Sequence, residues 1–202
     1  MGMKTEYANA EMVNLAIEND GISLATDGLI FHVEGDPREL IGRASEKFHA
    51  AVSGWPAAER YGGLFLGPTG SGKSSAAAWA VRRWRALVLR ENPFLAAPLM
   101  WLDAIEATDA ERRYRLGTGD PADLALAYSA QWLVLDDVGL STSPTIVQLV
   151  LARRYQGALP TLVTTGLTAP ELVAHIGAAS VRRIAEWRGK AGLLVDCHGS
   201  QL

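Results

Sequence analysis

Eight consecutive residues, Gly67 to Ser74, have the types and spacing needed to hold a chain of phosphates. They fit the pattern G-x-x-x-x-G-K-[ST], in which glycines let the backbone turn so that its amide hydrogens point at phosphate oxygens. Lys73 would reach the terminal phosphates, and the Ser74 hydroxyl would complete the coordination shell of Mg²⁺. We therefore expect a nucleoside triphosphate to contact Gly67, Pro68, Thr69, Gly70, Ser71, Gly72, Lys73, Ser74 and Ser75.

The segments on either side of this loop have the pattern that such a loop requires. Residues 63–66 read as a short buried strand, and residues 75–81, rich in alanine, read as a helix. A phosphate loop lies between a strand and a helix, because the helix N-terminus adds further amide donors for the anion. A glycine-rich turn without a ligand is the alternative, and the flanking segments disfavour it.

A second group of reactive residues follows the apolar run Trp132 to Leu135. Asp136 and Asp137 come at the carboxyl end of this predicted strand, where open α/β sheets bind their ligands. This is the Walker B pattern, in which Asp136 would hold Mg²⁺, directly or through water. Asp137 would orient and polarise the attacking water, although many such ATPases carry the longer Glu at this position. The two motifs together predict MgATP as the bound species.

The elements that must position these residues alternate between strands and helices from about residue 60 to residue 202. Strands are expected at 99–102, 132–135, 160–165 and 193–195, and helices from the loop to about 89 and at 104–116, 121–127 and 145–155. The strands are continuously apolar, which indicates that both faces of the sheet are covered. We therefore predict a P-loop NTPase fold, a parallel sheet in a three-layer α/β/α sandwich.

Residues 8–53 are predicted to form a small separate unit, joined to the core through residues 55–60. Their pattern is a helix, a hairpin around Asp27-Gly28 and a second helix. The stretch resembles the N-terminal docking domain of TubC-like proteins in Gly21 to Leu24, in Gly28-Leu29 and in the helix from Leu40 to Lys47. That resemblance implies binding of another protein. The alternative is that these residues pack on the ATPase core.

Composition excludes several classes of function. The net charge of −3 disfavours bulk attraction to nucleic acid, and no apolar run has the length of a membrane span. Cys197 is the single cysteine, which excludes a disulfide within the chain, so we expect a cytoplasmic protein without membrane contact. The arginine clusters at 82–85, 112–115, 153–154 and 182–183 read as solvated helix faces rather than as DNA contacts.

The core, about residues 60–199, resembles AAA+ ATPases of the DnaC/IstB type, which comprise helicase loaders and transposition helper ATPases. The resemblance is carried by residues 64–74, 132–139 and 154–165, and the third segment is the most specific. It implies hydrolysis of ATP to ADP and phosphate in DNA replication by a helicase-loader-like protein. The implied partners are a replicative helicase or another replication protein, single-stranded DNA, and further copies of the chain that share the ATP site.

The same resemblance assigns roles to residues near the end of the chain. Gly166 stands where the family carries the sensor 1 Asn, so the hydroxyl of Thr165, or alternatively that of Thr164, would replace the amide. Arg183 matches the arginine finger that acts on a neighbouring subunit's nucleotide, with Arg182 as the second choice. A surface arginine is the alternative for Arg183. Because the sequence ends at Leu202, soon after the last strand, we expect little or no C-terminal lid and no sensor 2 arginine.

These departures leave two further functions open. Without a sensor 1 amide and a lid, hydrolysis could be slow or negligible, and the protein would then be a nucleotide-gated switch that binds DNA or protein. A transposition helper ATPase, which would bind duplex DNA and a transposase, has the same core. The short N-terminal unit disfavours the helper.

Overall fold

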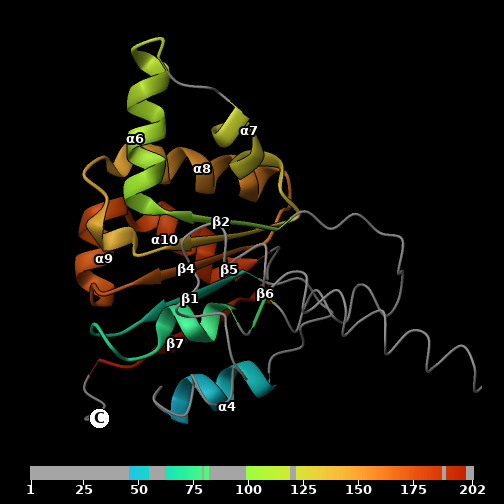
Figure 1. The fold of residues 1–202 in the computed structure, drawn as a ribbon. Coiled ribbons are helices and arrows are strands. Elements are labelled where there is room, and N and C mark those ends of the chain that lie inside the picture. Colours follow the sequence, from blue (N-terminus) through green and yellow to red (C-terminus); the bar gives the residue numbers. More distant parts are fainter. Residues whose placement is uncertain are drawn as a thin grey trace, which may run out of the picture.

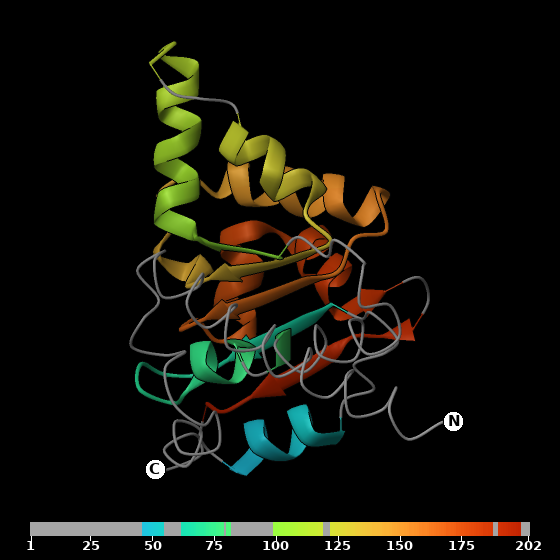
Figure 2. The same cartoon turned by 45° about the vertical axis from the view of Figure 1, so that its right-hand side comes forward.

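The computed structural model describes residues 46–54, 62–78, 80–81, 99–118, 122–187 and 190–198. Its central element is a five-stranded sheet in which every strand pair is parallel (Figures 1 and 2). The strand order is β2-β3-β4-β1-β7, so β4 lies between β1 and β3. The strands are β1 (Gly63–Leu66), β2 (Leu99–Asp103), β3 (Trp132–Asp136), β4 (Thr161–Thr165) and β7 (Leu193–Asp196).

Helices cover both faces of the sheet. One face carries five helices, and the other carries α4 together with the helix that follows the phosphate loop, which includes residues 73–78 and 80–81. A small antiparallel pair, β5 (Glu186–Trp187) with β6 (Lys190–Ala191), precedes β7. The predicted three-layer α/β/α sandwich is confirmed. The helices are α4 (Glu46–Gly54), α6 (Ala104–Arg115), α7 (Ala122–Ser129), α8 (Pro144–Gln156), α9 (Ala169–Ile176) and α10 (Ala178–Ala185), with a 3₁₀ turn η3 (Val138–Leu140).

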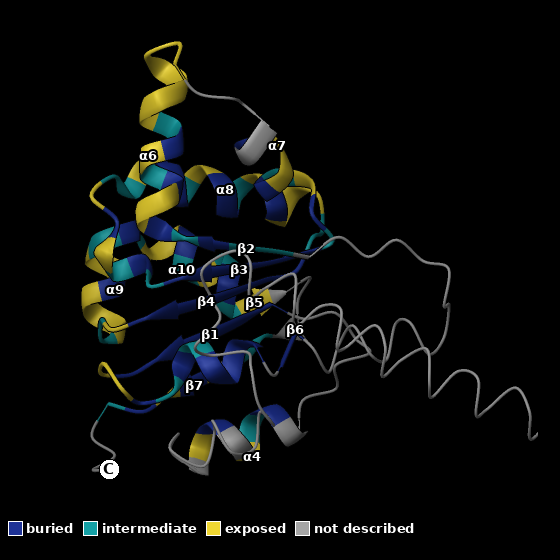
Figure 3. Cartoon of the chain, in the orientation of Figure 1, coloured by how far each residue is buried: buried dark blue, intermediate teal, exposed yellow. Residues whose placement is uncertain are grey.

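The apolar strands build two cores because successive side chains point to opposite faces. Leu133 and Leu135 pack with the face of α6 to α10, whereas Trp132 and Val134 pack with α4 and the helix after the loop. Figure 3 shows the resulting band of buried residues along the sheet. This double coverage explains why the strands are continuously apolar rather than alternating. Within the described residues no helix has the length and apolarity needed to cross a membrane.

Helix α4 is integrated into the core. Phe48 and Val52 are fully buried in the same cluster as Phe65, and the Phe48 and Phe65 rings lie 5.2 Å apart between centroids. The sequence placed this helix at the end of a separate unit, 8–53. The part of this unit that the structure describes, residues 46–53, packs on the core, and the prediction of a separate unit over 8–53 stays a prediction. The remaining expectations for the N-terminal unit, the joint at 55–60 and the helix continuing to about residue 89 lie outside the described residues.

Local sequence signals set the beginnings of the helices that leave the site. The Asp103 side chain accepts a hydrogen bond from the Ile105 amide at 2.6 Å and so caps α6. Pro144 occupies the first turn of α8, where its missing amide costs nothing. Thr168 and Glu171 form a capping box at α9, and these hydrogen bonds lower the pKa of Glu171.

One arginine that the sequence assigned to a solvated helix face is buried. Arg154 of α8 has no exposed surface, and its guanidinium donates to the carbonyl oxygens of Ala127, Ala130 and Pro160 and to the Thr161 hydroxyl, at 2.7–2.9 Å. The expectation was wrong because the carbonyls at the end of α7 and before β4 need donors that water cannot supply there. Burial lowers the pKa of Arg154 to about 9, so it stays charged at neutral pH.

Candidate nucleotide-binding site

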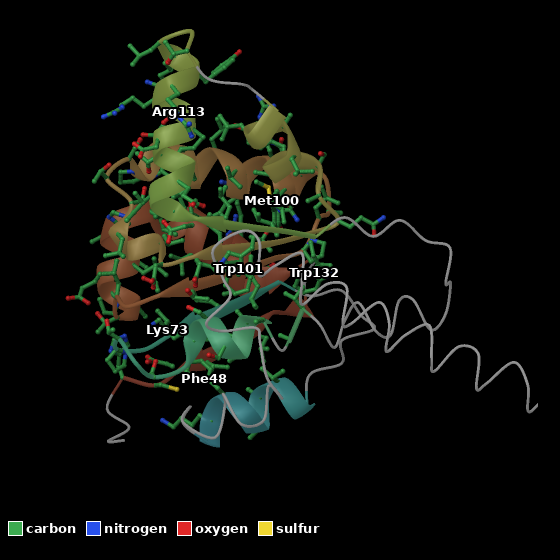
Figure 4. All side chains as sticks on the ribbon, viewed as in Figure 1. Phe48, Lys73, Met100, Trp101, Arg113 and Trp132 are labelled. Atoms are coloured by element: carbon green, nitrogen blue, oxygen red, sulfur yellow. The ribbon has the colours of Figure 1, made fainter. Side chains whose placement is uncertain are left out.

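The strand order brings three sequence segments to one edge of the sheet. Because β4 lies between β1 and β3, the carboxyl ends of these strands place the phosphate loop, the residues after Val163 and the aspartate pair side by side. In Figure 4 Lys73 lies on the side of the sheet that α4 covers, whereas Arg113 lies in the upper part of α6, away from the sheet. This edge is where open α/β sheets bind ligands.

The phosphate loop has the backbone that its glycines predict. Gly70 and Gly72 have φ values of 83° and 85°, a left-handed region that favours glycine. Gly67 is required for a different reason, since a Cβ there would lie 2.7 Å from the Ser71 Oγ atom and 3.2 Å from the Cys197 Cβ atom. Residues 68–70 are exposed, so the loop is open to a ligand from outside. The Ser71 Oγ atom is buried beneath it without a hydrogen-bond partner.

Lys73 is enclosed by the loop. Its side chain is 6% exposed, and its Nζ atom donates to the Pro68 carbonyl oxygen at 3.1 Å. Burial lowers the pKa of Lys73, and the opposing charges of Asp137 and Asp136 partly offset that shift. A buried ammonium group that donates to one carbonyl oxygen can donate to phosphate oxygens instead when a ligand binds.

Asp136 and Ser74 meet as the two motifs require. The Ser74 Oγ atom donates to the Asp136 Oδ1 atom at 3.0 Å, across 62 residues of sequence. Asp136 is 7% exposed, and burial raises its pKa, while hydrogen bonds from Thr164 and Ser74 lower it. A hydroxyl and a carboxylate fit Mg²⁺, which binds few protein oxygens and takes its other ligands from phosphate and water. Among the described residues no cluster of three or more His, Cys, Asp or Glu side chains could hold a metal ion without a phosphate.

Asp137 has an unusual backbone conformation. Its φ and ψ angles of 50° and 47° lie in the left-handed region, which Asp and Asn tolerate better than other side chains do. Its amide donates to the Thr164 Oγ1 atom at 3.0 Å. The residue is half-buried, and its carboxylate is the largest of the charges that raise the pKa of Lys73. Asp137 directly follows β3 and is hydrogen-bonded to Thr164 of β4, at the edge of the sheet that also carries the phosphate loop.

The two threonines at the end of β4 face opposite sides of the sheet. Thr164 points to the side of Asp136 and donates a hydrogen bond to it. The Thr165 Oγ1 atom accepts from the Leu167 amide at 3.1 Å, and it lies next to Gly139 on the other side. From the sequence we predict that the Thr165 hydroxyl is catalytic, with the Thr164 hydroxyl as the alternative. The contacts with the Walker B carboxylate are made by Thr164.

Gly166, at the sensor 1 position, is exposed and next to the loop. A Cβ atom there would meet nothing closer than the Gly67 carbonyl oxygen at 4.0 Å, and the φ of Gly166 is outside the left-handed region. Neither space nor backbone conformation therefore requires glycine at this position.

Arg183 lies at the opposite end of the sheet from Lys73. It is half-buried in α10 and lines a small cavity with Gly62, Tyr155 and Thr161. Gly62 precedes β1 and Thr161 begins β4, whereas the phosphate loop follows the carboxyl end of β1. A strand of four residues spans about 13 Å at 3.3 Å per residue, so Arg183 is too distant to touch a nucleotide on its own loop. Arg182 is exposed.

The other arginine clusters of the sequence lie in different surroundings in the structure. Arg112, Arg113 and Arg115 are exposed in the last turn of α6, and Arg115 pairs with Glu111 of the same helix. Arg153 lies over the Tyr128 ring, 4.7 Å from its centroid. The cluster at 82–85 lies outside the described residues.

Cys197 and His198 follow β7 and lie beside the site. Cys197 is buried under Gly67, and its amide donates to the Leu66 carbonyl oxygen at 2.9 Å. The His198 Nε2 atom is 3.1 Å from the Leu167 carbonyl oxygen, which joins the end of β7 to the loop that contains Gly166. No spacing in the sequence indicated these contacts.

A parallel sheet with a phosphate loop after β1 and an aspartate pair after β3 defines a P-loop nucleoside-triphosphatase fold. Among solved structures the chain is similar to the DnaC helicase loader, with a TM-score of 0.55 and 18% identity over 75% of this chain and 87% of that chain. It is similar to DnaI, with a TM-score of 0.50 and 18% identity over 80% and 90%. AMPPCP-bound DnaA from Aquifex aeolicus has a TM-score of 0.51 and 16% identity over 80% of this chain and 47% of DnaA.

These similarities establish the α/β fold of the AAA+ helicase loaders and initiators. No protein-family model matches the sequence, and no curated protein sequence is significantly similar to it. The AAA+ resemblance read from the sequence is therefore matched in three dimensions, at low sequence identity.

Proposed function

We propose that this chain binds MgATP and hydrolyses it to ADP and phosphate as a cytoplasmic helicase-loader-like protein in DNA replication. The proposal rests mainly on one observation: Lys73, Ser74 and Asp136 lie at the same edge of the sheet. Ser74 and Asp136 are joined there by a 3.0 Å hydrogen bond. The similar structures support the choice of class, because one is a helicase loader and another holds AMPPCP, an analogue of ATP.

Each residue of the proposed site has a defined part in the reaction. Amides of the loop and the Lys73 ammonium bind the phosphates and offset their charge. Ser74 and Asp136 would hold Mg²⁺. The ion would neutralise the negative charge that develops on the phosphate oxygens. The Asp137 carboxylate orients a water for in-line attack on the terminal phosphorus and accepts its proton.

Replacing Asp137 by asparagine is expected to lower the turnover of ATP at least 100-fold and to leave the Kd for MgATP within about threefold. Asparagine keeps the left-handed backbone and nearly the same shape, but it cannot accept the proton. Steady-state phosphate release and equilibrium titration of both proteins give the two quantities. Equal turnover in the variant and the wild type would remove Asp137 from the reaction.

The environment of Gly166 favours a second candidate, a nucleotide-gated switch with negligible hydrolysis, because no side chain reaches the terminal phosphate from the sensor 1 position. Gly166→Asn is expected to raise turnover about tenfold, since it adds an amide where a Cβ fits without contact. Gly166→Ala is the matched control for backbone effects. If the two variants turn over ATP at the same rate, a missing amide is not what limits hydrolysis.

The location of Arg183 supports a site shared between subunits. Arg183 lies at the far end of the strands from Lys73, so if its guanidinium acts on a nucleotide, that nucleotide belongs to a neighbouring copy. An arginine that stabilises the transition state in this way increases turnover by roughly 10³–10⁵. A second copy of the chain is therefore one proposed partner. A replicative helicase or other replication protein and single-stranded DNA are proposed from the similarity to helicase loaders and to a replication initiator bound to single-stranded DNA.

A further inference from the structure

One buried hydroxyl contacts both aspartates of the proposed catalytic pair. Thr164 has no exposed surface, and its Oγ1 atom donates to the Asp136 Oδ1 atom and accepts from the Asp137 amide at 3.0 Å. A hydroxyl has one proton to donate, so in Thr164 that proton is fully used by Asp136. Neither contact is predicted by the phosphate-loop or Walker B spacing.

The contact with Asp136 fixes which carboxylate oxygen faces a ligand. Thr164 and Ser74 both donate to Oδ1, and among the described residues no hydrogen bond goes to Oδ2. Ser74 is half-exposed and is itself a proposed ligand, whereas Thr164 belongs to the buried interior of β4. The buried Thr164 hydroxyl therefore holds the Asp136 carboxylate in one orientation, and the Asp136 Oδ2 atom stays available to a ligand.

The contact with Asp137 holds the backbone that aims the second carboxylate. An Asp residue in the left-handed region is less stable than one in the usual regions, and the surrounding structure must hold it there. Without the Thr164 hydroxyl, the Asp137 amide would lose the hydrogen-bond acceptor that it has among the described residues. One side chain thus sets the positions of both the metal-binding and the water-activating carboxylates.

We infer that Thr164 is a positioning residue that couples Mg²⁺ binding at Asp136 to the placement of Asp137. The inference rests on the proposed function, because it concerns the same MgATP site. Thr165, which the sequence favoured, has no such contact. Its hydroxyl accepts from the Leu167 amide on the other face of β4.

The test is equilibrium titration of the full chain with AMPPCP, in excess Mg²⁺ and in EDTA, for wild type, Thr164→Val and Thr164→Ser. Valine keeps the shape of threonine but has no hydroxyl, whereas serine keeps the hydroxyl. We expect Thr164→Val to weaken binding about tenfold or more in Mg²⁺ and to change it less than twofold in EDTA. Thr164→Ser is expected to stay within about threefold of wild type in both media.

The outcomes separate the two proposals. Absence of AMPPCP binding by the wild type in Mg²⁺ would overturn the proposed function and this inference with it. Wild-type binding together with equal binding by Thr164→Val, or an equal loss with and without Mg²⁺, would overturn the inference alone. If Thr164→Val does not fold, the comparison is made with Thr164→Cys, whose thiol is a weak donor, and the same Mg²⁺-dependent loss is expected.

Discussion

Alanine in place of Lys73 is expected to weaken MgATP binding at least 100-fold, a loss of about 2.7 kcal/mol. The ammonium group contributes hydrogen bonds to charged phosphate oxygens, and such bonds contribute about 1.5–3 kcal/mol each. In the free protein the same group donates a hydrogen bond to the Pro68 carbonyl oxygen at 3.1 Å. The lysine is therefore already inside the loop and needs little rearrangement to bind phosphate.

A thermal-shift series measures this effect together with folding. At an ATP concentration 100 times the Kd, the wild type gains about 2.7 kcal/mol of stability, which raises the melting temperature by roughly 5–10 °C. Lys73→Ala, whose Kd is expected to be at least 100 times higher, should gain about 0.4 kcal/mol or less, a rise of under about 2 °C. Lys47→Ala is the matched control, because Lys47 is exposed on α4, and it should keep the full ATP-dependent rise. A rise in Lys73→Ala equal to that in the wild type would contradict the assignment of the loop.

Arg154→Met is expected to lower the free energy of unfolding by about 3–5 kcal/mol. The substitution removes four hydrogen bonds. The carbonyl oxygens of Ala127 and Ala130 lose the guanidinium donor, and the Pro160 carbonyl oxygen keeps only the long 3.4 Å hydrogen bond from the Leu133 amide. These oxygens belong to the end of α7 and to the residue before β4, so the loss would loosen the start of the strand that carries Thr164. Urea unfolding followed by circular dichroism gives the midpoint and its slope.

Arg153→Ala provides the control for Arg154→Met. Arg153 has the same charge and lies on the same helix, but it is exposed and interacts with the face of the Tyr128 ring. Its removal should cost about 1 kcal/mol or less. A loss in Arg154→Met no larger than that in Arg153→Ala would show that the buried guanidinium does not hold α7 and β4 together.

The sequence predicted that Ser74 and Asp136 of the proposed nucleotide site would meet, because each belongs to a motif whose residues are close in the chain. Lys73 and Ser74 are fixed by the glycine spacing of the loop, and Asp136 by its place after four apolar residues. The carboxyl ends of parallel strands then meet at one edge of the sheet, whatever the exact strand order. The sequence alone therefore predicts that Ser74 and Asp136, which are 62 positions apart, lie close together.

To decide whether Thr164 or Thr165 contacts Asp136, one must know which face of the sheet each side chain points to. The alternation of side chains along the strands gives this information in the sequence. Val134 and Leu162 point to the same face of the sheet, so Asp136 and Thr164, two residues further along, share that face. Thr165 necessarily points to the other. The period of two along a strand was the signal that could have identified Thr164.

The burial of Arg154 and the contacts of His198 could not be predicted in the same way. Both depend on backbone carbonyl oxygens of other segments, Ala127 and Ala130 for Arg154 and Leu167 for His198. A carbonyl group is present at every residue and so leaves no pattern in the sequence. Only the packing of α7 against α8, and of β7 beside β1, shows which carbonyls lack a donor.

Calorimetric titration of the wild-type chain with AMPPCP in excess Mg²⁺ tests the central claim most directly. We expect one nucleotide to bind per chain and its affinity to fall when EDTA replaces Mg²⁺, because Ser74 and Asp136 would hold the ion against the phosphates. Absence of binding at millimolar nucleotide, or binding that is indifferent to Mg²⁺, would contradict it.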